Sequence, residues 1–115
     1  MNDRIRAYIW DAIDAGKDVM SFVSGGTFAD YSSSKLLQAA VERKLEIIGE
    51  ALKRIRDESP ATAELLEPNK AAIALRNLIA HEYDSVDQSI LWIIANRDVP
   101  ALIAQLESYL VDEPL

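Results

Sequence analysis

Cysteine is absent from this sequence of 115 residues, and histidine occurs once, at His81. A chain without cysteine cannot form disulfides, thiolate zinc sites, iron–sulfur clusters or cysteine nucleophiles. A single histidine cannot bring several imidazoles together within one chain, which disfavours zinc and non-haem iron sites. We therefore expect a protein that works without a metal ion or another cofactor.

The sequence also lacks long apolar runs, and only four glycines and four prolines interrupt it. No apolar run approaches the roughly 20 residues that a membrane span requires. The first six residues carry charges at Asp3, Arg4 and Arg6, where a signal peptide would be apolar. We expect a cytoplasmic protein whose residues 1–115 form a single domain, because this length suits one hydrophobic core.

Basic residues are scarce, with 12 lysines and arginines against 19 acidic residues and a formal net charge of -7. This balance argues against broad, sequence-independent binding to nucleic acid, because such binding comes from many phosphate contacts by lysine and arginine. Any contact with RNA must then be local or shared between subunits. The acidic balance alternatively favours a basic protein partner.

Half of the residues are apolar, and two long segments repeat them at helical spacing. The first runs from Asp3 to Val23 and its apolar positions are Ile5, Ile9, Ala12, Ile13, Met20 and Val23. The second runs from Ser34 to Asp57 and its apolar face comprises Leu37, Val41, Leu45, Ile48, Leu52 and Ile55, widened by Leu36, Ala40, Ile47 and Ala51. The opposite side of the second segment carries Glu42, Arg43, Glu46, Glu50, Lys53 and Arg54. We interpret that side as a solvated face with ion pairs at helical spacing.

Shorter helices are predicted in the rest of the chain. Pro60 opens a helical turn through Leu66, and helices follow at 69–81 and 87–96. Asp98 caps a final helix that accepts Pro100 in its first turn. The fold class is therefore all-α, as an up-and-down bundle of about five helices. Its apolar surface, including Trp10 and Trp92, exceeds what a small bundle hides, so we expect a homodimer.

Reactive polar groups gather in one otherwise apolar segment, Leu75 to Asp84. Arg76 offers a planar cation suited to a phosphate oxygen, and His81 is suited to proton transfer near neutral pH. On a straight helix these two residues lie about 140° apart, whereas Asn77 and His81 share one face. Either Arg76 reaches around the helix, or the helix ends near His81; the turn residues Asp84-Ser85 favour the second arrangement.

The spacing of Arg76, His81 and Tyr83 resembles the R-x4-H-x-Y signature of HepT-like HEPN proteins, also called the DUF86 family. The segment Glu46 to Leu52 in the preceding long helix is similar to the corresponding segment of that family. The run from Ser85 to Leu106 resembles the family's closing helices. The resemblance extends from about Arg4 to Leu110, and this sequence does not depart from the signature.

This resemblance implies a HEPN-type fold and a metal-independent endoribonuclease toxin whose two subunits form a shared cleft. His81 would act as general acid or base, Arg76 would hold the phosphate, and Asn77 would orient the substrate or His81. A dimer would supply the second imidazole that acid–base cleavage needs. RNA would be the substrate because its 2′-hydroxyl is a built-in nucleophile.

The resemblance further implies a type II-like toxin–antitoxin system with an MntA-like minimal nucleotidyltransferase as antitoxin. Tyr83 would accept AMP from this partner, and the added bulk and negative charge would inhibit the ribonuclease. Three alternatives remain. The protein could be a non-catalytic HEPN module that binds a nucleotide or the partner; it could be a purely structural helical dimer; or Arg76 and His81 could be an ordinary surface cation and a helix cap.

Overall fold

The computed structural model describes residues 2–65 and 87–112, and every element in these two ranges is a helix. The elements are α1 (Asp3–Val23), α2 (Phe28–Ser32), α3 (Lys35–Glu58), α4 (Pro60–Leu65), α6 (Gln88–Ile93), the π-helix η2 (Ile94–Asp98) and α7 (Val99–Asp112). The predicted helix at 69–81 lies outside the described residues. The all-α class and the helical bundle are confirmed.

Helix α1 has the bounds that the apolar spacing predicts. It begins after Asn2, whose side-chain oxygen accepts a hydrogen bond from the amide of Ile5 at 2.8 Å. It ends before a turn in which Gly25 has a φ of 74°, a backbone conformation that favours glycine. One face of the helix is buried, and its residues are Ile5, Ile9, Ala12, Ile13, Ala15, Gly16, Val19 and Val23. Met20, which we expected on this face, is exposed.

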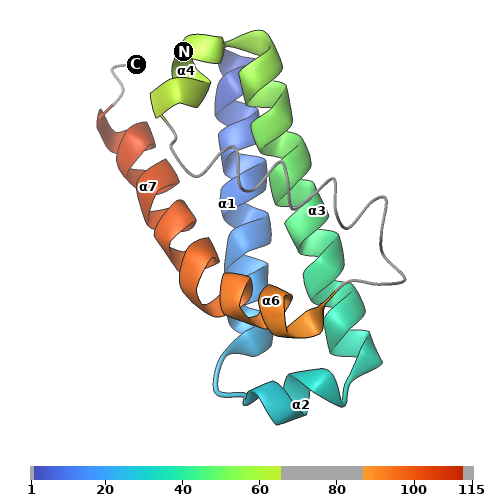
Figure 1. Ribbon diagram of the computed structural model, residues 1–115. Helices are drawn as coiled ribbons and strands as arrows, with labels where there is room; N and C mark the ends of the chain where they lie inside the picture. The colour runs from blue at the N-terminus through green and yellow to red at the C-terminus, as the bar shows by residue number, and fades with distance from the viewer. Residues whose placement is uncertain (1, 66–86, 113–115) are drawn as a thin grey trace.

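Helix α3 is the second long element and packs along α1 in the antiparallel sense (Figure 1). Its N-cap is Ser34, whose hydroxyl accepts a hydrogen bond from the amide of Leu37 at 3.1 Å. Its buried side repeats at three- and four-residue intervals, and comprises Val41, Leu45, Ile48, Gly49, Ala51, Leu52 and Ile55. Leu36 does not widen this face as predicted, because it is 83% exposed.

The sequence pattern did not identify α2, which joins the lower ends of α1 and α3 in Figure 1. A reciprocal pair of hydrogen bonds begins this helix. The Asp30 amide donates to the Thr27 hydroxyl at 3.2 Å, and the Thr27 amide donates to the Asp30 carboxylate at 3.0 Å. This capping box is the sequence signal that could have revealed the helix. The predicted turn after Ser59, in contrast, is confirmed as α4.

The C-terminal part of the chain is one continuous helical path from Gln88 to Asp112. We predicted a helix at 87–96 and a separate one capped by Asp98, and this division is wrong because Asp98 lies inside η2. Pro100 has no amide hydrogen, so the carbonyl of Asn96 cannot receive the usual bond from four residues ahead. In the π-helical turn the Val99 amide donates to the carbonyl of Ile94, five residues before it, and the helix continues through Pro100. The continuous helix keeps one uninterrupted buried side, which includes Ala95, Val99 and Leu102.

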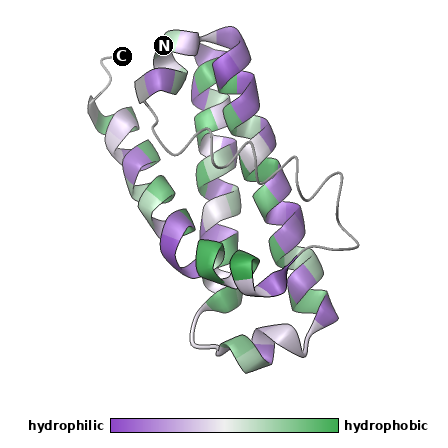
Figure 2. Cartoon of the chain, in the orientation of Figure 1, coloured by the Kyte–Doolittle hydropathy of each residue, from purple (hydrophilic) through white to green (hydrophobic). Residues whose placement is uncertain are grey.

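The hydrophobic core forms where α1, α3 and the C-terminal helical path meet. Helix α1 lies between α3 and α7 in Figure 1, and both neighbours run antiparallel to it. Figure 2 shows α6 as a strongly hydrophobic stretch, and two of its apolar side chains, Ile90 and Ile93, are about half exposed. Within the described ranges, none of the helices combines the length and apolar character that crossing a membrane would need.

Candidate functional site

The four residues that the sequence singles out, Arg76, Asn77, His81 and Tyr83, lie outside the described residues. The structure instead describes what leads into and out of this segment. Helix α4 ends at Leu65 before it, and α6 begins at Gln88 after it. Two features of the described residues merit attention as parts of a functional site: a groove on the α1–α3 face, and a polar and aromatic cluster at the beginning of α6.

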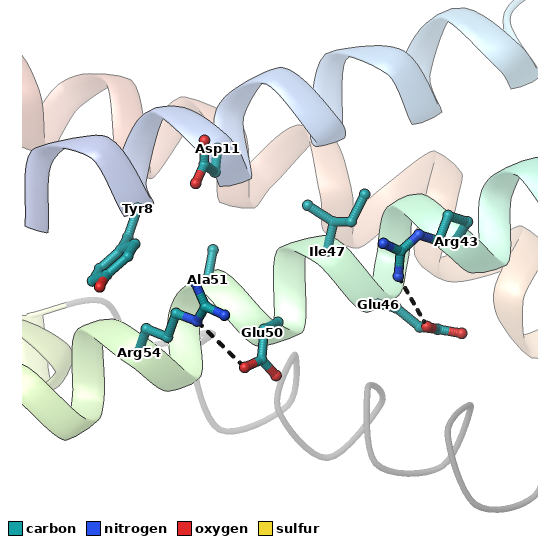
Figure 3. A pocket seen from close by; sticks show the side chains of 8 residues that line it. All are labelled: Tyr8, Asp11, Arg43, Glu46, Ile47, Glu50, Ala51 and Arg54. Carbon is teal, nitrogen blue, oxygen red and sulfur yellow. Dashed lines mark hydrogen bonds and ion pairs between the residues drawn. The ribbon is translucent and has the colours of Figure 1, made fainter. Parts of the chain in front are cut away.

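The groove has a volume of about 320 Å³ and lies between α1 and α3 (Figure 3). Its lining includes much of the segment at 46–52, which the resemblance had drawn attention to. Helix α1 contributes Tyr8 and Asp11, and α3 contributes Arg43, Glu46, Ile47, Glu50, Ala51 and Arg54. Two residues of the predicted solvated face of α3, Glu46 and Glu50, are therefore half-buried rather than fully exposed.

Ion pairs order the charged side chains of the groove. Arg43 Nη1 lies 3.5 Å from Glu46 Oε2, and Arg54 Nε lies 3.4 Å from Glu50 Oε1. The Arg54 guanidinium also lies 5.9 Å from the centre of the Tyr8 ring, within the range of a cation–π contact. Both guanidiniums thus already have carboxylate partners, so the groove presents a mixed polar lining rather than a basic one.

Chemically, the groove offers polar contacts over a small apolar floor formed by Ile47 and Ala51. Figure 3 shows these two side chains between the charged groups. In the described part of the chain, no three histidine, cysteine, aspartate or glutamate side chains gather closely enough to hold a metal ion. The groove can therefore accommodate a polar group through hydrogen bonds and charge, but its described residues do not supply an obvious acid–base pair.

The second feature is an aromatic cluster of Phe28 and Tyr31 from α2 with Trp92 from α6. The Tyr31 and Trp92 ring centres are 5.4 Å apart, and the Phe28 ring lies 6.3 Å from Trp92. These separations are typical of favourable tilted aromatic pairs. Tyr31 is fully buried, whereas Phe28 remains 41% exposed. The cluster therefore joins α2 to α6 through a buried ring.

A polar chain runs through this cluster. The Tyr31 hydroxyl donates to Gln88 Oε1, and the Gln88 side chain also hydrogen-bonds to Glu42 on α3. Burial raises the pKa of Tyr31, and the negative charge of Glu42 raises it further, so the phenol stays protonated and acts as a donor. Burial also raises the pKa of Glu42, although the hydrogen bond from Gln88 opposes this shift. Sequence reasoning placed Glu42 on a solvated face and missed this cluster.

By its fold, this is an all-helical bundle protein built on two long antiparallel helices. The sequence profile of the family described as Ribonuclease HepT-like matches residues 12–109. The chain belongs to this HepT-like family, as the signature at 76–83 had suggested. The match spans the described helices from α1 to α7 together with the predicted site segment.

The names of similar proteins support this family assignment. A protein of Methanocaldococcus jannaschii named "putative RNase" is 31% identical over 103 residues, covering 90% of this chain and 94% of its own. A second such protein of the same organism is 32% identical over 108 residues, with coverages of 94% and 88%. A "probable ribonuclease HepT" of Thermococcus cleftensis is 33% identical over 103 residues, with coverages of 87% and 90%. No solved structure gave a significant match.

Proposed function

We propose that this protein is a HEPN ribonuclease that cleaves RNA without a metal ion, through Arg76 and His81. The observation that carries the proposal is the R-x4-H-x-Y signature at 76–83, located within the part of the chain that matches the HepT-like family. Membership of a family described as ribonucleases supports the reaction class. The absence of cysteine and the single histidine favour a mechanism that depends on acid–base chemistry.

In the proposed reaction, the ribose 2′-hydroxyl attacks the adjacent phosphorus and the 5′-oxygen leaves. One proton must be removed from the nucleophile and one delivered to the leaving oxygen. One imidazole per chain supplies one such group, so we propose that a homodimer brings two copies of His81 to a shared cleft. Arg76 stabilises the phosphate charge that develops, and Asn77 orients the substrate or the imidazole.

The test measures cleavage of RNA in the presence of a chelator. The wild-type protein is expected to cut, and His81→Ala and Arg76→Ala are each expected to lower the rate by roughly 10²- to 10⁴-fold. Arg97→Ala is a matched control, because Arg97 is an exposed cation outside the signature and is paired with Asp98. Equal rates for the wild type and the His81 variant would refute the proposal, and a wild type that does not cut RNA would favour a non-catalytic HEPN module.

Regulation is the second part of the proposal. We propose that the protein is the toxin of a type II-like toxin–antitoxin pair in the cytoplasm, with an MntA-like minimal nucleotidyltransferase as its antitoxin. The Tyr83 hydroxyl would lose its proton and attack the α-phosphorus of ATP, releasing pyrophosphate. The AMP left on Tyr83 would add a phosphodiester near Arg76 and compete with the RNA phosphate. Its net charge of -7 suits a basic protein partner.

Intact mass after incubation with the nucleotidyltransferase and ATP tests this regulation. The wild-type chain is expected to gain one or more AMP groups and lose its RNase activity. Tyr83→Phe is expected to keep both its mass and its activity under the same conditions, because it keeps the ring and lacks the acceptor oxygen. An AMP-modified protein that still cuts RNA at the unmodified rate would contradict the proposed inhibition.

A further inference from the structure

Helix α2 is too short to be stable alone, yet both of its ends are secured. The Thr27–Asp30 capping box satisfies its N-terminal amides. At its C-terminal end, Gln38 on α3 donates from Nε2 to the carbonyl oxygens of Tyr31 and Ser32, at 3.1 Å and 3.0 Å. These contacts tie α2 to the first turns of α3. The position of Tyr31 relative to α3 is therefore fixed.

Tyr31 in turn contacts two positions of α6 that are one helical turn apart. Its hydroxyl donates to the side chain of Gln88, and its ring packs against Trp92 four residues later. Residues at this spacing lie on one face of a helix. Two contacts one turn apart define both the axial position and the rotation of α6. A contact at either position alone would leave one of these free.

The polar character of this contact is informative. An apolar side chain at position 31 or 88 would bury comparable surface without needing a hydrogen-bond partner. The hydrogen bond from the buried Tyr31 hydroxyl to the half-buried Gln88 favours one arrangement, because an arrangement that leaves this hydroxyl unpaired costs roughly 1–3 kcal/mol. Gln88 meets Tyr31 with its oxygen and Glu42 with its amide, so helices α2, α3 and α6 are linked through a single side chain.

We infer that Tyr31 and Gln88 are positioning residues for the candidate catalytic segment, because they fix the start of the helix into which that segment runs. Gln88 follows His81 by only seven residues and Tyr83 by five. Because the connecting chain is this short, the position of the first turn of α6 restricts where His81 can lie. The roles of His81 and Tyr83 rest on the proposed function, whereas the contacts of Tyr31 and Gln88 do not.

The single histidine allows a direct test on the intact protein. The ring Cε1–H signal of His81 is the only one of its kind in the chain, so a proton–carbon NMR spectrum reports its environment without assignment. Tyr31→Phe keeps the ring and removes the hydroxyl, and Gln88→Met keeps the length of the side chain and removes its amide. Each is expected to shift the His81 signal and its titration midpoint. The double variant is expected to shift them no further than Gln88→Met alone, because that substitution already removes the acceptor of the Tyr31 hydroxyl.

Asn2→Ala is the matched control for stability. It removes the cap of α1, at the opposite end of the bundle from α2 in Figure 1, and is expected to cost about 1 kcal/mol, similar to one lost hydrogen bond. If Tyr31 and Gln88 contributed to stability alone, folded samples of all three variants would give the same His81 signal as the wild type. Positioning predicts that Tyr31→Phe and Gln88→Met move the His81 signal and that Asn2→Ala does not.

Activity provides the second readout. In RNA cleavage, Tyr31→Phe is expected to lower kcat by roughly 10-fold with KM nearly unchanged, within the loss that a misplaced reacting group causes. If the wild type does not cut RNA, the proposed function fails while the NMR test of positioning still stands. If the wild type cuts RNA but neither variant changes kcat or the His81 signal, the positioning inference is overturned. Additive shifts in the double variant would also overturn it.

Discussion

At the scale of single residues, α1 packs tightly against α7 at Gly16. This glycine lies on the buried face of α1, opposite the side chain of Ile103 on α7. A Cβ atom at position 16 would lie 2.7 Å from Ile103 Cγ1 and closer still to Cδ1. Ile103 is itself buried, so it has little room to move. The missing side chain at position 16 thus sets how closely α1 and α7 approach.

We predict that Gly16→Ala destabilises the protein. Overpacking against Ile103 costs about 1–3 kcal/mol, whereas the better helix propensity of alanine returns up to about 1 kcal/mol. In an Ile103→Ala background, where the clashing atoms are gone, the same substitution should become neutral or stabilising. Urea denaturation of the four proteins in this cycle measures the coupling. A coupling near zero would show that the two helices separate easily at this point.

A second prediction at this scale concerns Glu42. Burial raises its pKa, the hydrogen bond from Gln88 opposes the shift, and the charge of Glu46 adds to it. Because the folded pKa lies above the unfolded pKa, the contribution of this group to stability is full below the unfolded value. It is lost as the pH rises through the folded value. Glu42→Gln, which cannot ionise, should therefore gain stability relative to the wild type between pH 4 and pH 7.

Urea denaturation at both pH values checks the Glu42 prediction. Glu107→Gln is a suitable control, because Glu107 is an exposed partner of Lys17 at 3.4 Å. Losing a surface ion pair costs less than about 1 kcal/mol. A Glu42→Gln protein whose stability relative to the wild type falls on going from pH 4 to pH 7 would show that the buried carboxylate is favourable.

At the scale of elements, the ends of the helices are determined mainly by local capping. Asn2, Ser34 and Asp87 each accept a backbone amide hydrogen bond at the beginning of α1, α3 and α6. Such caps are visible in sequence, and all three helix starts were predicted to within one residue. Asp98 is also a favourable capping residue, but here its backbone continues a helix. Burial of the neighbouring Val99 decided against a break.

We predict that Thr27→Ala loosens α2 and lowers the free energy of unfolding by about 1 kcal/mol, as loss of an N-cap typically does. Thr27→Ser keeps the hydroxyl and should retain most of the stability. Hydrogen exchange at the amide of Asp30 measures the local effect, because that amide donates to the Thr27 hydroxyl. Unchanged exchange in the alanine variant would mean that contacts elsewhere hold the helix without its capping box.

At the scale of the whole molecule, the described surface combines many ion pairs with several large exposed apolar side chains. The ion pairs are solvent-accessible and contribute little stability individually. Trp10 is 45% exposed, and Ile90 and Ile93 are 48% and 47% exposed. Large exposed apolar side chains mark a surface that meets another protein where they are neighbours, and Ile90 and Ile93 lie three residues apart on α6. They are consistent with the dimer on which the proposed mechanism depends.

We predict that light scattering in solution gives a mass twice the 12.8 kDa of one chain. The unfolding temperature should also rise with protein concentration, because dissociation accompanies unfolding of a dimer. A dilution series is the internal control, since a monomer has the same mass and the same unfolding temperature throughout. A mass of 12.8 kDa at every concentration would contradict the two-histidine mechanism.

Sequence alone determined the helical class, the two long helices and their buried faces. These follow from apolar spacing and caps, which act over a few residues and do not depend on distant parts of the chain. The signature at 76–83 likewise depends only on residue types and spacing. Membership of the HepT-like family was confirmed, while the signature and the roles of Arg76, Asn77, His81 and Tyr83 stay predictions.

The tertiary structure decided what depends on residues distant in sequence. Leu36 was expected to be buried and is exposed, and Glu42 was expected to face solvent but contacts Gln88 of α6. Burial is a property of the neighbours that a side chain meets, and local spacing does not specify them. The merging of the last two predicted helices has the same cause, because packing against α1 favours an unbroken helix over the local preference of Asp98 and Pro100.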